Sequence, residues 1–166
     1  MGGRELVSPT SSEFYVALCP IAETRPLNLV ISEMARKLIN SGSTFEELVG
    51  YSRAVVDREW IFVSGTTGFD YETMSISEGL LEQTEQCLKN IESTLRQADA
   101  TIKDVVQVLY ILANASEFEQ CWPVLRRCFG DVRPAATMIS AGLADPRIKI
   151  EIQVTARRSG ETIKQG

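Results

Sequence analysis

The amino-acid sequence predicts an α+β domain in which helices pack on one face of a mixed β-sheet. A chain of 166 residues is long enough to bury a core without disulfides or metals. Apolar and polar residues alternate between residues 148 and 155, which is typical of a strand with one buried face. Strand and helix patterns follow one another as β-α and then β-β-α-β-α-β-β, an order that favours a mixed sheet.

Residues 1–44 are interpreted as an N-terminal extension. Residues 1–13 are rich in Ser and Gly and are predicted to be loose, and residues 14–18 are predicted to form a short strand. Pro26 then opens a helical pattern that Ser41-Gly42 stops. Its apolar positions are Leu27, Ile31, Met34 and Leu38. This apolar face needs a cover, either on the main domain or on a neighbouring subunit.

Two strands open the main domain, which is placed at residues 45–158 and followed by a tail at 159–166. Residues 51–56 and 60–64 are predicted to be strands joined by a tight turn. Gly65 and Gly68 are expected to end the second strand. They form either a plain turn or a place where the backbone approaches a ligand or another strand closely.

Two helices are predicted on either side of a buried strand at residues 105–112. A capping box at residues 75–78 begins the first helix. Its buried stripe is predicted to be Leu81, Thr84, Leu88, Ile91 and Leu95. A second capping box at residues 116–119 begins a helix that reaches Phe129. Because Pro123 lies inside this pattern, the helix either starts late or is kinked beside Trp122.

The last two strands, within residues 133–143 and 148–155, are predicted to face each other across a turn at residues 145–147. The buried side of the second strand is Ile148, Ile150, Ile152 and Val154. Glu151 lies on its other side, among polar and basic residues. From the pattern alone, Glu151 is either a solvated acid or a functional group.

Composition excludes several kinds of site. The chain has no histidine, which rules out Ser-His-Asp and Cys-His arrangements and His-ligated metals. A net charge of −5 argues against nucleic-acid binding. The four cysteines form no Cys-x-x-Cys pair and are expected to be free thiols in the core: Cys19, Cys87, Cys121 and Cys128. The chain has neither a signal-peptide pattern nor a membrane-spanning apolar run, so we expect a cytoplasmic protein that does not bind membranes.

Several short motifs follow one another in a single order across residues 45–158: Gly50-Tyr51-Ser52-Arg53-Ala54-Val55, Ile61-Phe62-Val63-Ser64-Gly65, Phe129-Gly130-Asp131, Arg133-Pro134-Ala135 and Ile150-Glu151-Ile152. Together they resemble the reactive-intermediate deaminase family (Rid, or YjgF-type). The resemblance implies a chorismate-mutase-like fold and a homotrimer with small-molecule clefts between neighbouring subunits. It also implies hydrolysis of an imine or enamine to a ketone and ammonia, with no metal or organic cofactor.

The resemblance assigns catalytic roles to Glu151, which matches the carboxylate that holds the attacking water, and to Tyr51, which matches the tyrosine of the cleft. Gly65 matches the glycine whose backbone approaches the ligand, and Ser64 precedes it. We expect Glu151 to face the cleft, near Tyr51 or Gly65 of an adjacent subunit.

The other half of the site departs from the family pattern. The arginine that binds the substrate carboxylate is replaced by Ala136, and the cysteine position is Met138, with Thr137 between them. The family asparagine falls on Trp122, which either lines an apolar cleft or fills the former pocket. If another cation replaces the missing arginine, Arg53 and Arg133 are the nearest in sequence.

Three functions follow from this split. The first is an imine or enamine hydrolase that acts on a neutral, more apolar substrate and has little of the usual family activity. The second is a trimer that binds a small ligand or regulates without turnover. The third, an endoribonuclease, is the least expected for an acidic chain without histidine.

Overall fold

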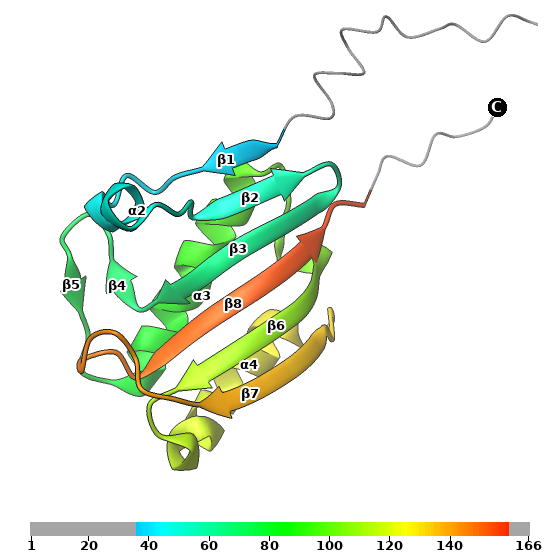
Figure 1. Cartoon of the computed structure of the whole chain (residues 1–166). Coiled ribbons are helices and arrows are strands. Elements are labelled where there is room, and N and C mark those ends of the chain that lie inside the picture. Colours follow the sequence, from blue (N-terminus) through cyan, green and yellow to red (C-terminus); the bar gives the residue numbers. More distant parts are fainter. Residues whose placement is uncertain (1–35, 160–166) are drawn as a thin grey trace, which may run out of the picture.

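The computed structural model describes residues 36–159, and Figure 1 shows their arrangement. A mixed sheet runs in the order β1-β2-β3-β8-β6-β7, with β6 and β7 parallel and the other neighbouring strands antiparallel. Its strands are β1 (Lys37–Ile39), β2 (Ala54–Asp57), β3 (Trp60–Thr67), β6 (Val105–Leu112), β7 (Ala135–Ser140) and β8 (Ile150–Arg157).

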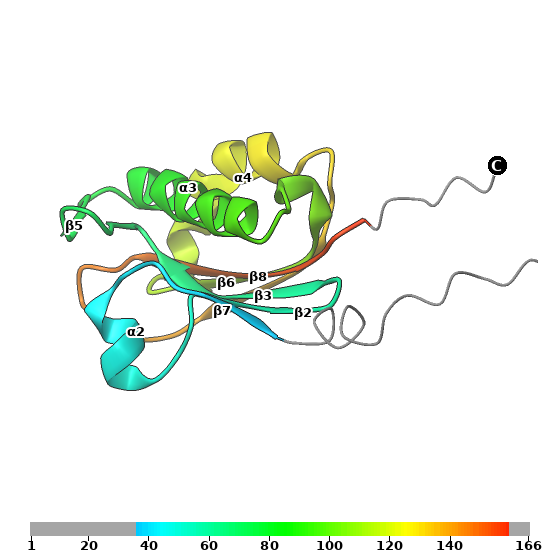
Figure 2. The same ribbon diagram turned by 90° about the horizontal axis from the view of Figure 1, so that it is seen from above.

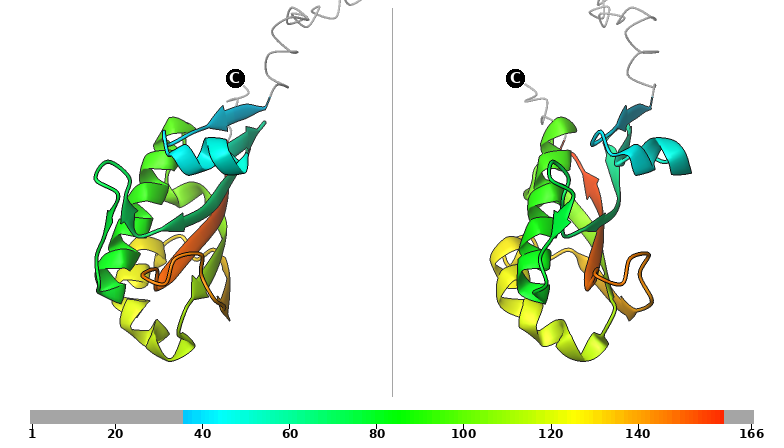
Figure 3. Two further views of the ribbon diagram at one scale, coloured as in Figure 1. Left: turned by 60° about the vertical axis from the view of Figure 1, so that its left-hand side comes forward. Right: turned by 90° about the vertical axis from the view of Figure 1, so that its left-hand side faces the viewer.

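Two helices, α3 (Leu80–Gln97) and α4 (Trp122–Phe129), cover one face of this sheet, as Figure 2 shows. The hydrophobic core lies between these helices and the sheet, and its fully buried side chains include Ile61, Ile91, Leu95, Leu112, Ile150 and Ile152. The short helix α2 (Thr44–Val49) lies on the opposite side, which we call the open face (Figure 3). The predicted α+β class and the helix-covered mixed sheet are therefore confirmed.

The N-terminal prediction is wrong where the structure describes it. Residues 37–39 form a strand rather than the end of a helix. They pair antiparallel with β2, and Ile39 enters the core while the neighbouring Leu38 stays exposed on the other face of the sheet. The rest of that helix and the strand at residues 14–18 lie outside the described residues. Helix α2 was not predicted. Its first turn is capped by the Ser43 side chain, and Gly50 ends it in the left-handed conformation.

The hairpin of β2 and β3 is confirmed, but Gly65 does not end β3. The strand continues to Thr67 through a β-bulge between Val63 and Thr66, where β3 carries one residue more than β8. A small hairpin, β4 (Phe69–Asp70) with β5 (Ser75–Ile76), then leads into α3. A side chain at Gly68 would overlap the backbone of Gln83, so this glycine allows the end of β3 to pack directly on α3.

The first capping box is wrong, because Ser75 belongs to β5 and α3 begins only at Leu80, after Gly79. The buried stripe consequently starts at Leu80, and Leu81 is exposed, whereas the later predicted positions are buried. The other helix does start late: a 3-10 helix (Ala115–Cys121) capped by Asn114, not Ser116, precedes α4, and Pro123 lies in the first turn of α4.

The last two strands do not pair with each other, because β6 lies between β7 and β8. The alternation predicted for β8 is confirmed: Ile150, Ile152 and Val154 are buried, and Glu151 leaves the core. No helix within residues 36–159 has the length and apolar character needed to cross a membrane.

Candidate active site

The bulge of β3 forms the floor of the candidate site on the open face. Gly65 lies in this bulge, and the Glu151 carboxylate fills the space that a side chain at Gly65 would occupy. The Ser64 hydroxyl donates to the carbonyl of Ser52 over 2.8 Å, which ties the bulge to the segment before β2. Gly65 thus meets Glu151 of its own chain, so this contact does not need the adjacent subunit that we expected.

Glu151 lies near the start of β8, where it pairs with Thr67 of β3 and Ile111 of β6. Its side chain is half-buried. Burial raises the pKa of the Glu151 carboxyl, and the charge of Arg53 offsets part of that rise. A carboxylate that has lost part of its water is a stronger base than a fully solvated one, which is the property a general base requires.

Arg53 lies beside Glu151 and is buried, although most arginines lie at the surface. Its Nε donates to Glu46 of α2 over 3.1 Å, and the Ser41 hydroxyl and backbone N–H also donate to that carboxylate. One Arg53 terminal nitrogen donates to the Gly65 carbonyl over 3.0 Å. The other donates to the Tyr51 hydroxyl over 3.3 Å.

Two tyrosine rings flank the guanidinium group of Arg53. Its central carbon lies 5.6 Å from the ring centroid of Tyr51 and 5.0 Å from that of Tyr71, the residue that follows β4. Burial raises the pKa of the Tyr71 hydroxyl, and Arg53 opposes the rise. Tyr51 also lines an open groove of about 900 Å³ between α2 and the sheet, together with Ser64, Glu46 and Val55.

Two of the residues at the altered family positions, Ala136 and Met138, lie on the helix-covered face of the sheet. Ala136 and Met138 pair with Val108 and Tyr110, whose side chains enter the helix-covered core, so both face away from Glu151. Ala136 borders a separate groove beside α4, with Tyr110, Arg126 and Arg133. Thr137 alternates to the open face, opposite Leu109 of β6.

Trp122 does not fill a pocket within the described chain. It is 52% exposed at the start of α4 and meets Phe118 edge to face, with ring centroids 6.5 Å apart. Phe118 in turn packs on Tyr110, at 5.6 Å between centroids. An aromatic row therefore leads from the exposed Trp122 to the groove beside Ala136.

The structure assembles Glu151, Tyr51, Ser64 and Gly65, and separates them from Trp122, Ala136 and Met138. Sequence reasoning named Arg53 only as a substitute cation and missed Glu46 and Tyr71 altogether. Glu46 lies in the first turn of α2, where an acid is commonly stabilised by the helix dipole, so its position gave no sign of a buried ion pair.

The cysteines of the described chain are free thiols, and the one nearest the site in charge effects, Cys87, is not a nucleophile. Cys87 and Cys121 are free and buried, Cys128 is free and partly buried, and Cys19 lies outside the described residues. Burial and the charge of Glu151 both raise the pKa of the Cys87 thiol, which keeps it protonated. Within residues 36–159, no three Cys, Asp or Glu side chains are grouped so that they could hold a metal ion.

Comparison with known proteins gives consistent matches over the described domain. A family model described as Endoribonuclease L-PSP matches residues 41–158. A RutC family protein of Pyrococcus abyssi is 30% identical over 124 residues, which are 74% of this chain and 98% of that protein. The human 2-iminobutanoate/2-iminopropanoate deaminase is 26% identical over 127 residues, covering 76% of this chain and 93% of that protein.

Solved structures match over the same region. A member of the YjgF/YER057c/UK114 family from Mycobacterium tuberculosis superposes with a TM-score of 0.68 and 34% identity, covering 75% of this chain and all of that chain. A putative endoribonuclease from Thermotoga maritima superposes with a TM-score of 0.65 and 31% identity, covering 75% of this chain and 94% of that chain.

Proposed function

The chain belongs to the endoribonuclease L-PSP (YjgF-type) family, and on that premise we propose that it is an imine or enamine deaminase that works without a metal. The observation that carries the proposal is the half-buried Glu151 carboxylate held against Gly65, with Arg53 beside it. Relatives named as deaminases, from human and from Arabidopsis thaliana, support the reaction class.

In the proposed reaction, Glu151 activates a water molecule. The water oxygen attacks the carbon of the protonated imine while a Glu151 oxygen accepts one of the water protons, and the product is a neutral carbinolamine. Glu151 then returns the proton to the nitrogen. The C–N bond breaks, ammonia leaves with the bonding electrons, and the hydroxyl proton passes to the Glu151 carboxylate, which gives the carbonyl product.

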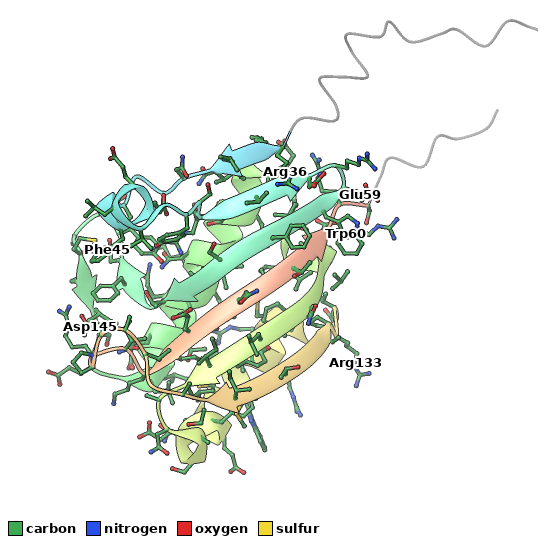
Figure 4. All side chains as sticks on the ribbon, in the orientation of Figure 1. Arg36, Phe45, Glu59, Trp60, Arg133 and Asp145 are labelled. Atoms are coloured by element: carbon green, nitrogen blue, oxygen red, sulfur yellow. The ribbon has the colours of Figure 1, made fainter. Side chains whose placement is uncertain are left out.

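We propose that the site closes between the subunits of a homotrimer. Glu151 and Ala136 point to opposite faces of one sheet. The half of the family site that contains Glu151 can therefore meet the half that contains Ala136 only if a second copy of the chain supplies one of them. The open face also carries apolar side chains that another copy can cover. Leu38, Trp60, Phe62 and Ile139 are among them, and Figure 4 shows Trp60 there.

We propose further that the substrate carries an apolar group and no carboxylate. The groove beside Ala136 has an apolar floor that includes Val108, Leu125 and Phe129. Arg133 stands at the start of β7 (Figure 4) and is exposed like Arg126, so water already solvates both. A substrate carboxylate placed against Ala136 loses its hydration without gaining a bidentate partner.

The test is ammonia release from two imines with the same side chain. An amino-acid oxidase generates the carboxylate-bearing imine from leucine, and an amine oxidase generates the neutral imine from 3-methylbutylamine. We expect the protein to accelerate hydrolysis of the neutral imine more strongly. Glu151→Gln should lose at least about a hundredfold of this activity, the lower range for a general base.

Glu92→Gln, on the exposed side of α3, is the matched control and should keep full activity. Binding of the amine without any acceleration would favour the non-catalytic trimer instead. A higher rate with the leucine imine would contradict the proposed substrate class while leaving the reaction class standing.

A further inference from the structure

The Arg53–Glu46 ion pair is almost completely withdrawn from solvent. The two side chains are each 4% exposed, and their charged atoms lie 3.1 Å apart. A buried ion pair of this kind is expensive to form unless other polar groups satisfy the remaining hydrogen-bonding positions. Here Ser41 satisfies the carboxylate, while Gly65 and Tyr51 accept from the guanidinium group.

These contacts and its burial make Arg53 a poor replacement for the missing family arginine. Three of the five N–H groups of Arg53 are engaged inside the described chain, and its side chain is only 4% exposed, so the remaining two N–H groups are not presented to solvent as an anion-binding fork. Its two ring neighbours, Tyr51 and Tyr71, cover the planar group as well.

We infer instead that Arg53, paired with Glu46, is a positioning residue for Glu151. It holds the Gly65 carbonyl in the β3 bulge and the Tyr51 hydroxyl, and the Glu151 carboxylate rests in the space above Gly65. Movement of the bulge would therefore move the catalytic carboxylate. This inference rests on the proposed function, since it assigns a role within the same site.

The charge of Arg53 adds an electrostatic role to the geometric one. Arg53, which directly precedes β2, is the charged group that acts on Glu151, while the Cys87 thiol of α3, whose pKa Glu151 itself raises, stays protonated. Glu46 from α2 faces Arg53 on its far side. Removing the positive charge therefore takes away the interaction that favours the ionised form of Glu151, and the pKa of Glu151 should rise further.

The experiment is a carbon-13 NMR titration of the glutamate carboxyl groups in the full chain, in which the Glu151 signal is identified by its loss in Glu151→Gln. Arg53→Gln leaves Glu46 unpaired in the interior and can fail to fold. The double variant Arg53→Gln/Glu46→Gln removes both charges and avoids that problem. In it we expect the pKa of Glu151 to rise by about one unit.

Arg53→Lys separates the two roles, because lysine keeps the charge but not the planar fork. In this variant the pKa of Glu151 should stay close to that of the wild type, while kcat for imine hydrolysis falls by about tenfold or more. The acid limb of kcat/KM against pH should move upward only in the double variant. Arg36→Gln, which breaks the exposed Arg36–Asp57 pair at the other end of β2, is the control and should change neither quantity.

An unchanged Glu151 titration in the double variant would overturn the electrostatic role, and full kcat in Arg53→Lys would overturn the positioning role. The titration needs no substrate. If the wild type hydrolyses no imine, the proposed function fails, and the NMR result still decides whether Arg53 acts on Glu151.

Discussion

At the scale of single residues, the site depends on the contact between a glycine and a carboxylate. The Glu151 carboxylate occupies the volume above Gly65, and it can do so only because residue 65 has no side chain. The bulge in β3 is what brings them together, because it offsets the register between β3 and β8 beside Thr67.

Gly65→Ala tests this contact directly. The added methyl group overlaps the end of the flexible Glu151 side chain, so we expect the fold to persist and the carboxylate to swing away. Imine hydrolysis should fall by about tenfold or more, with little change in melting temperature. Gly142→Ala, where a methyl group meets nothing within 4 Å, is the control. Full activity in Gly65→Ala would separate the glycine from catalysis.

The alternation of β8 was sufficient to predict that Glu151 leaves the core, since Ile150 and Ile152 must enter it. No sequence pattern could predict where its carboxylate rests, because that depends on a bulge in β3. Nor could it predict that Arg53 is buried, since arginine is normally exposed and its partner Glu46 lies in a six-residue helix with a weak signal.

At the scale of elements, α3 fixes the end of β3. The Asn90 side chain donates to the carbonyls of Thr67 and Phe69, over 3.2 and 2.8 Å. The Gln83 side chain joins the same helix to the loop before β8, because it accepts from Lys149 N–H and donates to the Arg147 carbonyl. Helix α3 thus holds the end of β3 that carries Thr67 and the start of β8 that carries its pairing partner Glu151.

Asn90→Ala should therefore destabilise the protein by about 1–3 kcal/mol, because it leaves two backbone carbonyls without their donor. Urea denaturation followed by circular dichroism measures this free energy of unfolding. Ser93→Ala, on the exposed side of α3, is the control and should change it by less than about 0.5 kcal/mol. Equal stabilities for the two variants would mean that water replaces the Asn90 donor.

Element types were easier to predict than element boundaries and partners. The strand at residues 105–112 was predicted with its true ends, because it is an unbroken apolar run. Pairing of the last two strands was predicted wrongly, since adjacency in sequence favours a hairpin and nothing local reveals that β6 lies between them.

At the scale of the whole molecule, the open face is the surface through which we propose that copies assemble. Its apolar side chains lie on strands from both ends of the sheet, Leu38 on β1 and Ile139 on β7, with Phe62 between them on β3. The area is therefore broad and spans the sheet, which is the form expected of a surface that another copy covers.

Light scattering at micromolar concentration should give a mass three times the 18.4 kDa of one chain. Phe62→Glu should break this assembly, because a charge on the open face would have to be buried in each interface. Leu81→Glu, at an exposed position on α3, should leave the mass unchanged. A wild-type monomer would contradict the trimer and, with it, the site shared between subunits.

The position of β8 in the sheet also bears on synthesis. It comes after the other described strands in the sequence, yet it lies between β3 and β6. Until the ribosome has released residues 150–157, β1 to β3 and β6 to β7 are two separate pieces, each with an unpaired edge. The nascent chain therefore exposes aggregation-prone strands until translation of this region is finished, and the sheet can close only in one late, cooperative step.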